Sequence, residues 1–204
     1  MELNQIKENA KKYSIPIIRS ESHKVLLDMI KKYQPKNILE IGTAVGYSGI
    51  LMLENSEATL TTIEHNKEYA KQAVKNFKQA KVWNRVKLVE GDCLVELAKM
   101  VASKNFFETF DFIFLDGPKA QYDAMLELLL ILLKKNGVFL ADNVTFRGYI
   151  TGEIQAPTRR YKTIVKRLNT FIENCKNSPN LTQFNLINVE DGLIFAIKDT
   201  NNEQ

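Results

Sequence analysis

The sequence predicts a doubly wound α/β fold: a seven-stranded sheet, mostly parallel, with helices on both faces and an antiparallel C-terminal strand at one edge. Short apolar runs alternate with amphipathic segments from residue 36 to residue 142, which implies parallel strands joined by crossover helices. Near the C-terminus, two apolar runs flank Glu190-Asp191-Gly192, a hairpin signal. A length of 204 residues suits one domain, with helices in residues 1–35 and the sheet in residues 36–198.

Two helices are expected before the sheet. Residues 2–12 have amphipathic spacing, and Pro16 ends that segment because proline restricts the residue before it. Ser20 begins a second helix, whose apolar residues recur at helical spacing as far as Tyr33. Pro35 then separates this helix from the first strand.

The sheet follows in regular order. Its strands are recognised by short apolar or β-branched runs, and the intervening helices by apolar residues on one side. Strands are expected at 37–41, 59–64, 86–90, 110–116, 137–142, 184–189 and 193–197. Helices are expected at 46–55, 66–81, 93–101, 122–133 and 158–175.

The first strand and the turn after it carry the clearest ligand signal. An apolar run that includes Glu40 leads into Gly42 and Gly46, and a helix follows. Glycines let a ligand approach the backbone, and the helix N-terminus offers N–H donors. Glu40 stands where a dinucleotide motif has its first glycine, and a carboxylate there suits a cationic sulfonium better than a pyrophosphate. The pattern favours S-adenosylmethionine over NAD, and the alternative is an ordinary strand–turn–helix connection.

Acidic residues end five successive predicted strands. Ligands of open α/β sheets bind outside the carboxyl ends of the strands, so converging carboxylates indicate a ligand with hydroxyl groups and positive charge. These residues are Glu40, Glu64, Asp92, Asp116 and Asp142. Glu64, about twenty residues after the glycine turn, is placed to bind a ribose; alternatively, it caps the helix at Asn66. Asp92 either contacts adenine or caps the helix at Cys93.

Asp116, Asp142 and Asn143 form a second candidate site. Two carboxylates and an amide oxygen at neighbouring strand ends suit an octahedral Mg²⁺, although a helix cap and a turn would explain them equally simply. Lys119 is close enough in sequence to act as a general base there, unless it is an ordinary surface lysine.

Basic residues form the third feature. Arg147 and Tyr149 follow the metal pair, and Arg159 and Arg160 open the long helix. Arginine for phosphate and an aromatic ring for stacking suit single-stranded RNA, whereas further charges on the helix are typical of a solvated face. A net charge of +4 permits a polyanionic partner.

Bulk features indicate a cytoplasmic protein without a membrane segment. No apolar run reaches spanning length, and the N-terminus lacks a signal-peptide pattern. Cys93 and Cys175 make no metal-binding pattern; reduced thiols are expected, with a disulfide as the alternative.

The motifs together resemble the metal-dependent O-methyltransferase family, which includes catechol and caffeoyl-CoA O-methyltransferases. The resemblance covers residues 15–198. The segments that carry it are Glu40–Ser48, Ile63-Glu64, Gly91-Asp92, Asp116–Lys119 and Asp142-Asn143. Residues 142–148 and 167–171 look most like the short bacterial enzymes that methylate 5-hydroxyuridine at the wobble position of tRNA.

The resemblance implies a role for each matched position. The cofactor-binding set is Ile18, Glu40, Gly42, Tyr47, Ser48, Glu64, Asp92, Cys93 and Asp116. Within this set Glu40, Gly42, Tyr47 and Ser48 would hold the methionine portion, Glu64 the ribose, and Asp92 with Cys93 the adenine. Asp116, Asp142 and Asn143 would bind Mg²⁺, and Lys119 with Asp116 would form the catalytic pair.

The resemblance also implies a substrate and an assembly. The substrate would be a tRNA anticodon loop, with Arg147, Tyr149, Arg159 and Arg160 as contacts, and the protein a homodimer. Catechol enzymes use a further acid that has no match in the hairpin at residues 191–194, which disfavours a catechol. A small-molecule phenol O-methyltransferase and a non-catalytic S-adenosylmethionine-binding module are the alternatives.

Overall fold

The computed structural model describes residues 3–13, 15–145, 150 and 158–199, without the side chain of Arg160. The chain divides into two compact units, Met1–Glu96 and Leu97–Gln204, and each is described by itself. The organisation as one domain therefore stays a prediction.

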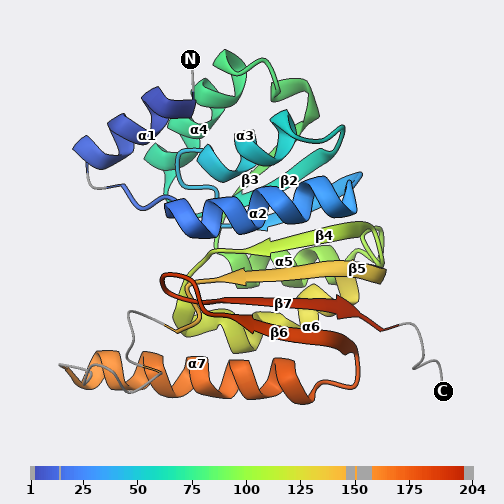
Figure 1. The fold of residues 1–204 in the computed structure, drawn as a ribbon. Coiled ribbons are helices and arrows are strands. Elements are labelled where there is room, and N and C mark those ends of the chain that lie inside the picture. Colours follow the sequence, from blue (N-terminus) through green and yellow to red (C-terminus); the bar gives the residue numbers. More distant parts are fainter. Residues whose placement is uncertain (1–2, 14, 146–149, 151–157, 200–204) are drawn as a thin grey trace. The chain divides into compact units, whose positions relative to one another are not determined.

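The first unit contains three parallel strands in the order β3-β2-β1 (Figure 1). The strands are β1 (Asn37–Ile41), β2 (Thr59–Glu64) and β3 (Val86–Glu90). The helices are α1 (Leu3–Lys12), α2 (Ser20–Tyr33), α3 (Tyr47–Glu54) and α4 (Lys67–Gln79), with the short 3-10 turn η1 (Trp83–Arg85). α1 and α2 both pack against α3 (Figure 1). The division between the units falls inside α5 (Cys93–Ala102).

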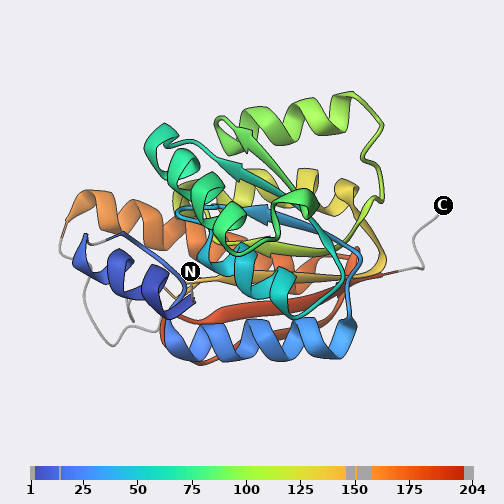
Figure 2. The ribbon, with the colours of Figure 1, turned by 90° about the horizontal axis from the view of Figure 1, so that it is seen from above.

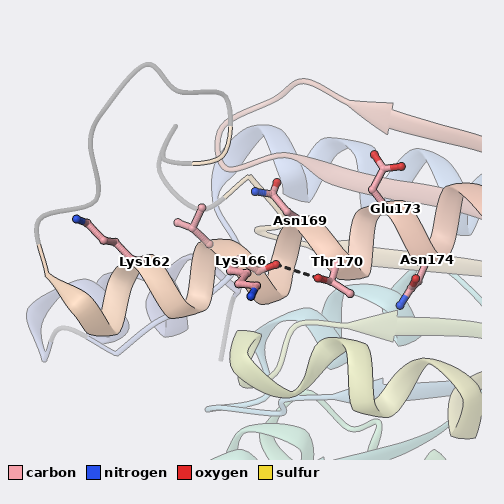
Figure 3. Close-up of a pocket in the computed structure, with 7 residues that line it drawn as sticks. Lys162, Lys166, Asn169, Thr170, Glu173 and Asn174 are labelled. Carbon is pink, nitrogen blue, oxygen red and sulfur yellow. Dashed lines mark hydrogen bonds between the residues drawn. The ribbon is translucent and has the colours of Figure 1, made fainter.

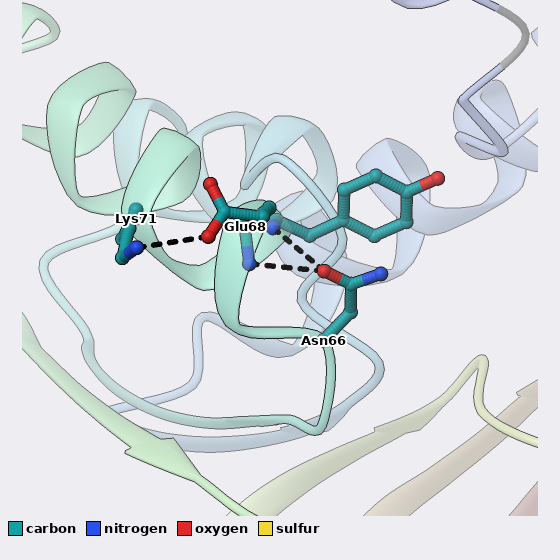
Figure 4. A network of polar contacts seen from close by, with 4 residues as sticks. Asn66, Glu68 and Lys71 are labelled. Atoms are coloured by element: carbon teal, nitrogen blue, oxygen red, sulfur yellow. Dashed lines mark hydrogen bonds and ion pairs between the residues drawn. The ribbon is translucent and has the colours of Figure 1, made fainter.

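The N-terminus of α4 is fixed by a side-chain cap. The Asn66 side-chain oxygen accepts hydrogen bonds from the backbone N–H groups of Glu68 (3.0 Å) and Tyr69 (3.2 Å) (Figure 4). Lys71 forms an ion pair with Glu68 one turn later, at 2.8 Å. Asn66 thus satisfies two of the amide groups that a helix start leaves unpaired, and it leaves Glu64 for another role.

Two glycines allow α3 to pack closely on its neighbours. Gly46 has a φ of +84°, and a Cβ there would lie 3.1 Å from the Phe77 ring. At Gly49, inside the helix, a Cβ would lie 2.8 Å from Leu60 Cδ2 and 3.0 Å from the same ring. The turn after β1 therefore needs glycine for both conformation and space.

The second unit contains four strands in the order β4-β5-β7-β6 (Figure 1). β4 pairs with β5 in parallel, and β7 pairs with both β5 and β6 in antiparallel fashion. The strands are β4 (Phe110–Leu115), β5 (Leu133–Asp142), β6 (Leu181–Ile187) and β7 (Leu193–Lys198). The 3-10 turn η2 (Lys119–Gln121) leads into α6 (Tyr122–Leu132), and α7 (Arg159–Asn177) lies beside α6 (Figures 1 and 2).

Two predicted strand boundaries in this unit are wrong. β5 begins at Leu133, directly after α6, rather than at residue 137, because the polar run Lys134–Asn136 is part of the strand. β6 covers Leu181–Ile187 rather than residues 184–189. Its register shifts near Gln183, which has a φ of +53°, and this irregularity hides the strand from an alternating pattern.

The C-terminal hairpin also differs from the expected arrangement. Five residues, 188–192, connect β6 to β7, so the connection is two residues longer than the expected Glu190-Asp191-Gly192. The antiparallel strand β7 lies between β5 and β6, and β6 forms the edge. The predicted strand set is otherwise confirmed, with three strands described in the first unit and four in the second.

Both cysteines, Cys93 and Cys175, are free and buried, so the alternative of a disulfide is wrong. Within the described ranges, no helix is long and apolar enough to cross a membrane.

Candidate functional site

Glu40, in β1, lies at the centre of a buried network of hydroxyl groups. Its side chain is completely buried. Ser48 Oγ donates to Oε1 at 2.5 Å and Thr62 Oγ1 donates to Oε2 at 2.6 Å. Thr43 is joined to Thr62 by a further hydroxyl contact of 2.5 Å. Glu40 therefore links β1 to β2 and to the first turn of α3. Through Thr62 and Thr43, the same network reaches the glycine turn.

Burial raises the pKa of Glu40 from 4.5 to about 7. The hydrogen bonds from Ser48 and Thr62 oppose this shift, and the charge of Glu64 adds to it. Two hydroxyl donors already occupy the carboxylate, so the structure shows a supporting role for Glu40. Direct contact between Glu40 and a methionine portion stays a prediction.

Glu64, at the end of β2, is held by the backbone of two turns. Its Oε2 accepts from Ala44 N–H at 2.8 Å, and its Oε1 accepts from Asn66 N–H at 2.7 Å. Ala44 has a φ of +44°, an uncommon conformation for a residue with a Cβ. Asn66, and not Glu64, caps α4. Glu64 is thus fixed beside the glycine turn and stays half-buried, as an acid that binds a ribose diol requires.

Asp92 caps the helix that follows it. Its Oδ1 accepts from the N–H groups of Leu94 (3.0 Å) and Val95 (3.2 Å), at the start of α5. The capping interpretation is therefore confirmed, and an added contact with adenine stays a prediction. The neighbouring Cys93 is buried, and burial together with the charge of Asp92 raises its pKa to about 11. Cys93 is accordingly a neutral thiol, and its expected place beside adenine stays a prediction.

Tyr47, the first residue of α3, contacts a residue to which the sequence assigned no role. Its hydroxyl lies 3.0 Å from His23 Nδ1, in α2, and the two rings meet edge to face at 5.8 Å between centroids. Burial, together with the charge of Lys7, lowers the pKa of His23. Ile18 is buried near the start of α2. His23 thus orients Tyr47, and no local sequence pattern indicates this pairing.

In the second unit, the predicted metal residues lie together at the ends of β4 and β5. Asn143 Nδ2 donates to Asp116 Oδ1 at 3.1 Å, and Asn143 N–H donates to Asp142 Oδ1 at 2.8 Å. Asp142 is only 1% exposed. Asn143 has a φ of +61°, a strained backbone of the kind that clusters at functional sites. The three residues therefore lie together as expected, and their role as metal ligands stays a prediction.

Two features behind this constellation were not predicted. The buried Tyr122 hydroxyl, in α6, lies 3.0 Å from the Asp142 carbonyl oxygen and 3.3 Å from that of Leu115, and it donates to both. The hairpin supports the other side, where Thr145 N–H donates to Asp191 O at 2.8 Å. A Cβ on Gly192 would lie 2.5 Å from Thr145 Cγ2. The Asp-Gly pair therefore braces the segment after Asn143 and also closes a tight turn, in which Gly192 N–H donates to the Val189 carbonyl oxygen at 2.7 Å.

The donor set fits a hard divalent cation. Carboxylate and amide oxygens are ligands that Mg²⁺ accepts. Among the residues described, no group of three or more His, Cys, Asp and Glu side chains lies around one possible metal position. An ion bound by Asp116 and Asp142 would therefore depend on the Asn143 amide as its third protein ligand.

Lys119 begins η2, three residues after Asp116, and is half-buried. Helix α7 holds this segment through two polar contacts. Arg167 Nη1 donates to the Ala120 carbonyl at 3.1 Å, and Asn174 Nδ2 donates to Asp123 Oδ1, in the first turn of α6, at 2.6 Å. The position of Lys119 thus depends on α7, over sequence distances that local patterns do not reveal.

The predicted RNA contacts are only partly visible. Arg159 is exposed at the start of α7. Arg147, Tyr149 and the side chain of Arg160 lie outside the described residues, so their roles stay predictions.

The chain matches the model of the O-methyltransferase family over residues 1–199. Caffeoyl-CoA O-methyltransferase 2 from Petunia hybrida is 26% identical over 151 residues, which are 73% of this chain and 62% of that protein. Caffeoyl-CoA O-methyltransferase 1 from Arabidopsis thaliana is 30% identical over 135 residues, 65% of this chain and 52% of the relative. The chain thus spans about half to three fifths of these relatives' length.

Solved structures are similar over nearly the whole chain. A Staphylococcus aureus protein, provisionally assigned as a caffeoyl-CoA O-methyltransferase, has a TM-score of 0.86 and 30% identity, with 97% of this chain and 92% of that chain covered. An O-methyltransferase from Bacillus cereus in complex with S-adenosylhomocysteine has a TM-score of 0.82 and 26% identity, covering 97% and 90%. These likenesses confirm the Rossmann-like α/β class, and the chain belongs to the O-methyltransferase family.

Proposed function

We propose that this protein is an S-adenosylmethionine- and Mg²⁺-dependent O-methyltransferase that methylates 5-hydroxyuridine at the wobble position of tRNA. The observation that carries the proposal is that hydrogen bonds hold Asp116, Asp142 and Asn143 together at the ends of β4 and β5. Together with family membership, this oxygen-rich site indicates transfer to a hydroxyl group.

The first unit would hold the methyl donor. S-adenosylmethionine supplies a methyl group on a positively charged sulfur. Glu64, fixed by Ala44 and Asn66, is placed to accept hydrogen bonds from a ribose diol. Gly42, with a φ of +100°, exposes backbone that a ligand can approach. The S-adenosylhomocysteine in the Bacillus cereus relative supports this choice of cofactor.

The second unit would activate the substrate. Mg²⁺ held by Asp116, Asp142 and Asn143 would lower the pKa of a hydroxyl bound to it. Tyr122 and the hairpin form hydrogen bonds with the backbone that carries Asp142 and the segment after it, and so fix the position of these ligands. The neighbouring carbonyl of 5-hydroxyuridine offers a second oxygen, much as a catechol does.

Lys119 would act as the general base. In the transfer, the hydroxyl proton moves to Lys119 Nζ, the substrate oxygen forms a bond with the methyl carbon, and the carbon–sulfur bond breaks. The products are the methyl ether, S-adenosylhomocysteine and protonated lysine, so atoms and charge balance. The residues of the chain contribute alignment of the reactants.

The choice of tRNA is supported by charge. The protein carries a net charge of +4, and Arg159 is exposed at the start of α7. A small phenol is the second candidate, because the curated relatives are caffeoyl-CoA O-methyltransferases by name. A non-catalytic cofactor-binding module would need neither the paired aspartates nor Lys119.

Mass spectrometry of tRNA nucleosides from a strain that lacks the gene separates these candidates. The proposal predicts loss of 5-methoxyuridine and an equal gain of 5-hydroxyuridine. Unchanged 5-methoxyuridine in that strain, together with methyl transfer to caffeoyl-CoA or catechols by the purified protein, would favour the small-molecule activity instead.

A further inference from the structure

The first half of α7 carries a concentration of positive charge that helix stability does not explain. Residues 159–168 include five cations, Arg159, Arg160, Lys162, Lys166 and Arg167, and no acid. No acidic side chain lies in the first turn of the helix. The N-terminal end of a helix is the positive end of its dipole, so each cation close to that end destabilises the helix.

Most of this charge is not neutralised within the described part of the chain. Arg159, Lys162 and Lys166 are exposed, and their side chains form no ion pair or hydrogen bond with any residue that the structure describes. Other exposed lysines do pair, as Lys71 does with Glu68. Arg167 is different, because its guanidinium is engaged with the Ala120 carbonyl. Nothing in the described part of the chain therefore keeps Arg159, Lys162 and Lys166 from an external anion.

These cations continue into a shallow groove along one side of α7. The groove has a volume of about 540 Å³, and the described residues that line it all belong to α7 (Figure 3). Lys162 and Lys166 line its first part, followed by the amide of Asn169 and the hydroxyl of Thr170. Ammonium, amide and hydroxyl groups are the side chains that contact phosphate and sugar oxygens in nucleic-acid complexes. The acid that lines the groove, Glu173, comes later in the helix.

The same helix touches the segment that carries Lys119. α7 packs against η2, and the contact between Arg167 and Ala120 lies one residue after Lys119. Residues 159 to 167 cover about 12 Å of helix axis. A chain that lies along this stretch would therefore reach the neighbourhood of Lys119 in the same unit.

We infer that the first half of α7 binds the sugar–phosphate backbone of single-stranded RNA and leads it toward Lys119. The inference rests on the proposed function for the identity of the substrate. The occupant is RNA rather than a second copy of the chain, because six of the seven described residues that line the groove are charged or polar, two of them lysines, and Val165 is the one apolar residue among them.

Fluorescence anisotropy with a labelled anticodon stem-loop RNA tests the inference. The variant Lys162→Glu/Lys166→Glu should raise the Kd more than tenfold. In Lys162→Ala/Lys166→Ala, the slope of log K against log salt should fall by roughly 0.7 for each lost single-strand phosphate contact. The matched control is Lys31→Glu/Lys32→Glu, which makes the same charge change at exposed positions in the last turn of α2 and should leave both quantities unchanged.

Three readouts make the outcome decisive. Equal RNA affinity in wild type and the α7 variants would overturn the inference, as would a change in sedimentation mass without a change in RNA affinity, which would assign the face to self-association. In methyl-transfer assays, the variants should raise KM for RNA and keep the wild-type kcat at saturation. A wild type that binds RNA through these lysines but methylates no RNA would support the docking surface and contradict the proposed function.

Discussion

Because the carboxyl group of Glu40 is buried beside the glycine turn, its titration makes the stability of the protein depend on pH. Its pKa is raised from 4.5 to about 7 in the folded protein, so between these values the folded state holds a proton that the unfolded state has released. The contribution of Glu40 to stability is therefore fully present below pH 4.5 and is lost as pH rises toward 7. Each pKa unit is worth about 1.4 kcal/mol, so the loss is about 3 kcal/mol.

Urea unfolding of the ligand-free protein at several pH values tests this effect. Glu40→Gln keeps the shape of the side chain and removes its titratable group. Between pH 4.5 and pH 8, the unfolding free energy of wild type should therefore fall by about 3 kcal/mol more than that of the variant. Parallel pH profiles for the two proteins would contradict the assignment.

Tyr122 supports the candidate metal site without being one of its proposed ligands. Tyr122→Phe removes the hydroxyl that bridges the Leu115 and Asp142 carbonyl oxygens. Because the two buried carbonyl oxygens lose their donor, the free energy of unfolding of the variant should be about 1–3 kcal/mol lower than that of wild type. It should also bind Mg²⁺ more weakly in calorimetric titrations.

A tyrosine of the first unit provides the comparison. Tyr13, which is 65% exposed, should tolerate replacement by phenylalanine without change in either quantity. Wild-type Mg²⁺ affinity in Tyr122→Phe would show that the hydroxyl serves stability alone.

At the scale of elements, α7 acts on the site through the short turn η2. Arg167→Gln breaks the contact with the Ala120 carbonyl and should lower kcat at least several-fold, because Lys119 loses its fixed position. The RNA Kd should stay within twofold of wild type, in contrast to the lysine variants of the groove. Steady-state kinetics and anisotropy on the same preparations measure both effects.

The matched control lies on the same helix. Lys176 is exposed in the last turn of α7, and Lys176→Gln should leave kcat unchanged. If Arg167→Gln and Lys176→Gln have equal kcat values, the contact between Arg167 and the Ala120 carbonyl oxygen has no part in catalysis.

The sequence anticipated much of the site because its signals are local. The acids at strand ends follow short apolar runs, and parallel strands bring such ends to one edge, so Asp116, Asp142 and Asn143 could be grouped before the structure was known. Asp92 showed why a local signal is ambiguous: the same acid at the same place caps α5.

The residues that sequence reasoning missed act across long separations. His23 meets Tyr47, Tyr122 meets the Asp142 carbonyl, and Arg167 meets Ala120. No spacing rule connects such pairs. The start of β5 was missed for another reason, since its polar residues, including Lys134 and Lys135, look like a loop although the strand contains them.

For the whole molecule, metal binding and folding should be linked. A ligand that binds only the folded state stabilises it by about 2.7 kcal/mol at a concentration one hundred times its Kd. Mg²⁺ should therefore raise the Tm of wild type, and a chelator should reverse the rise. Asp142→Asn and Asn143→Ala should each show a Tm that is insensitive to Mg²⁺, as measured by differential scanning calorimetry. If neither Mg²⁺ nor the chelator changes the Tm of wild type, the proposed metal site is wrong.

Methyl transfer to the natural RNA is the most direct measurement of the central claim. Purified protein would be mixed with S-adenosylmethionine and with tRNA from a strain that lacks the gene, with Mg²⁺ or with excess chelator, and the nucleosides quantified by mass spectrometry. We expect 5-methoxyuridine to appear in step with the loss of 5-hydroxyuridine, only when the metal is present. Absence of 5-methoxyuridine with the metal present, or its full formation in excess chelator, would contradict the account.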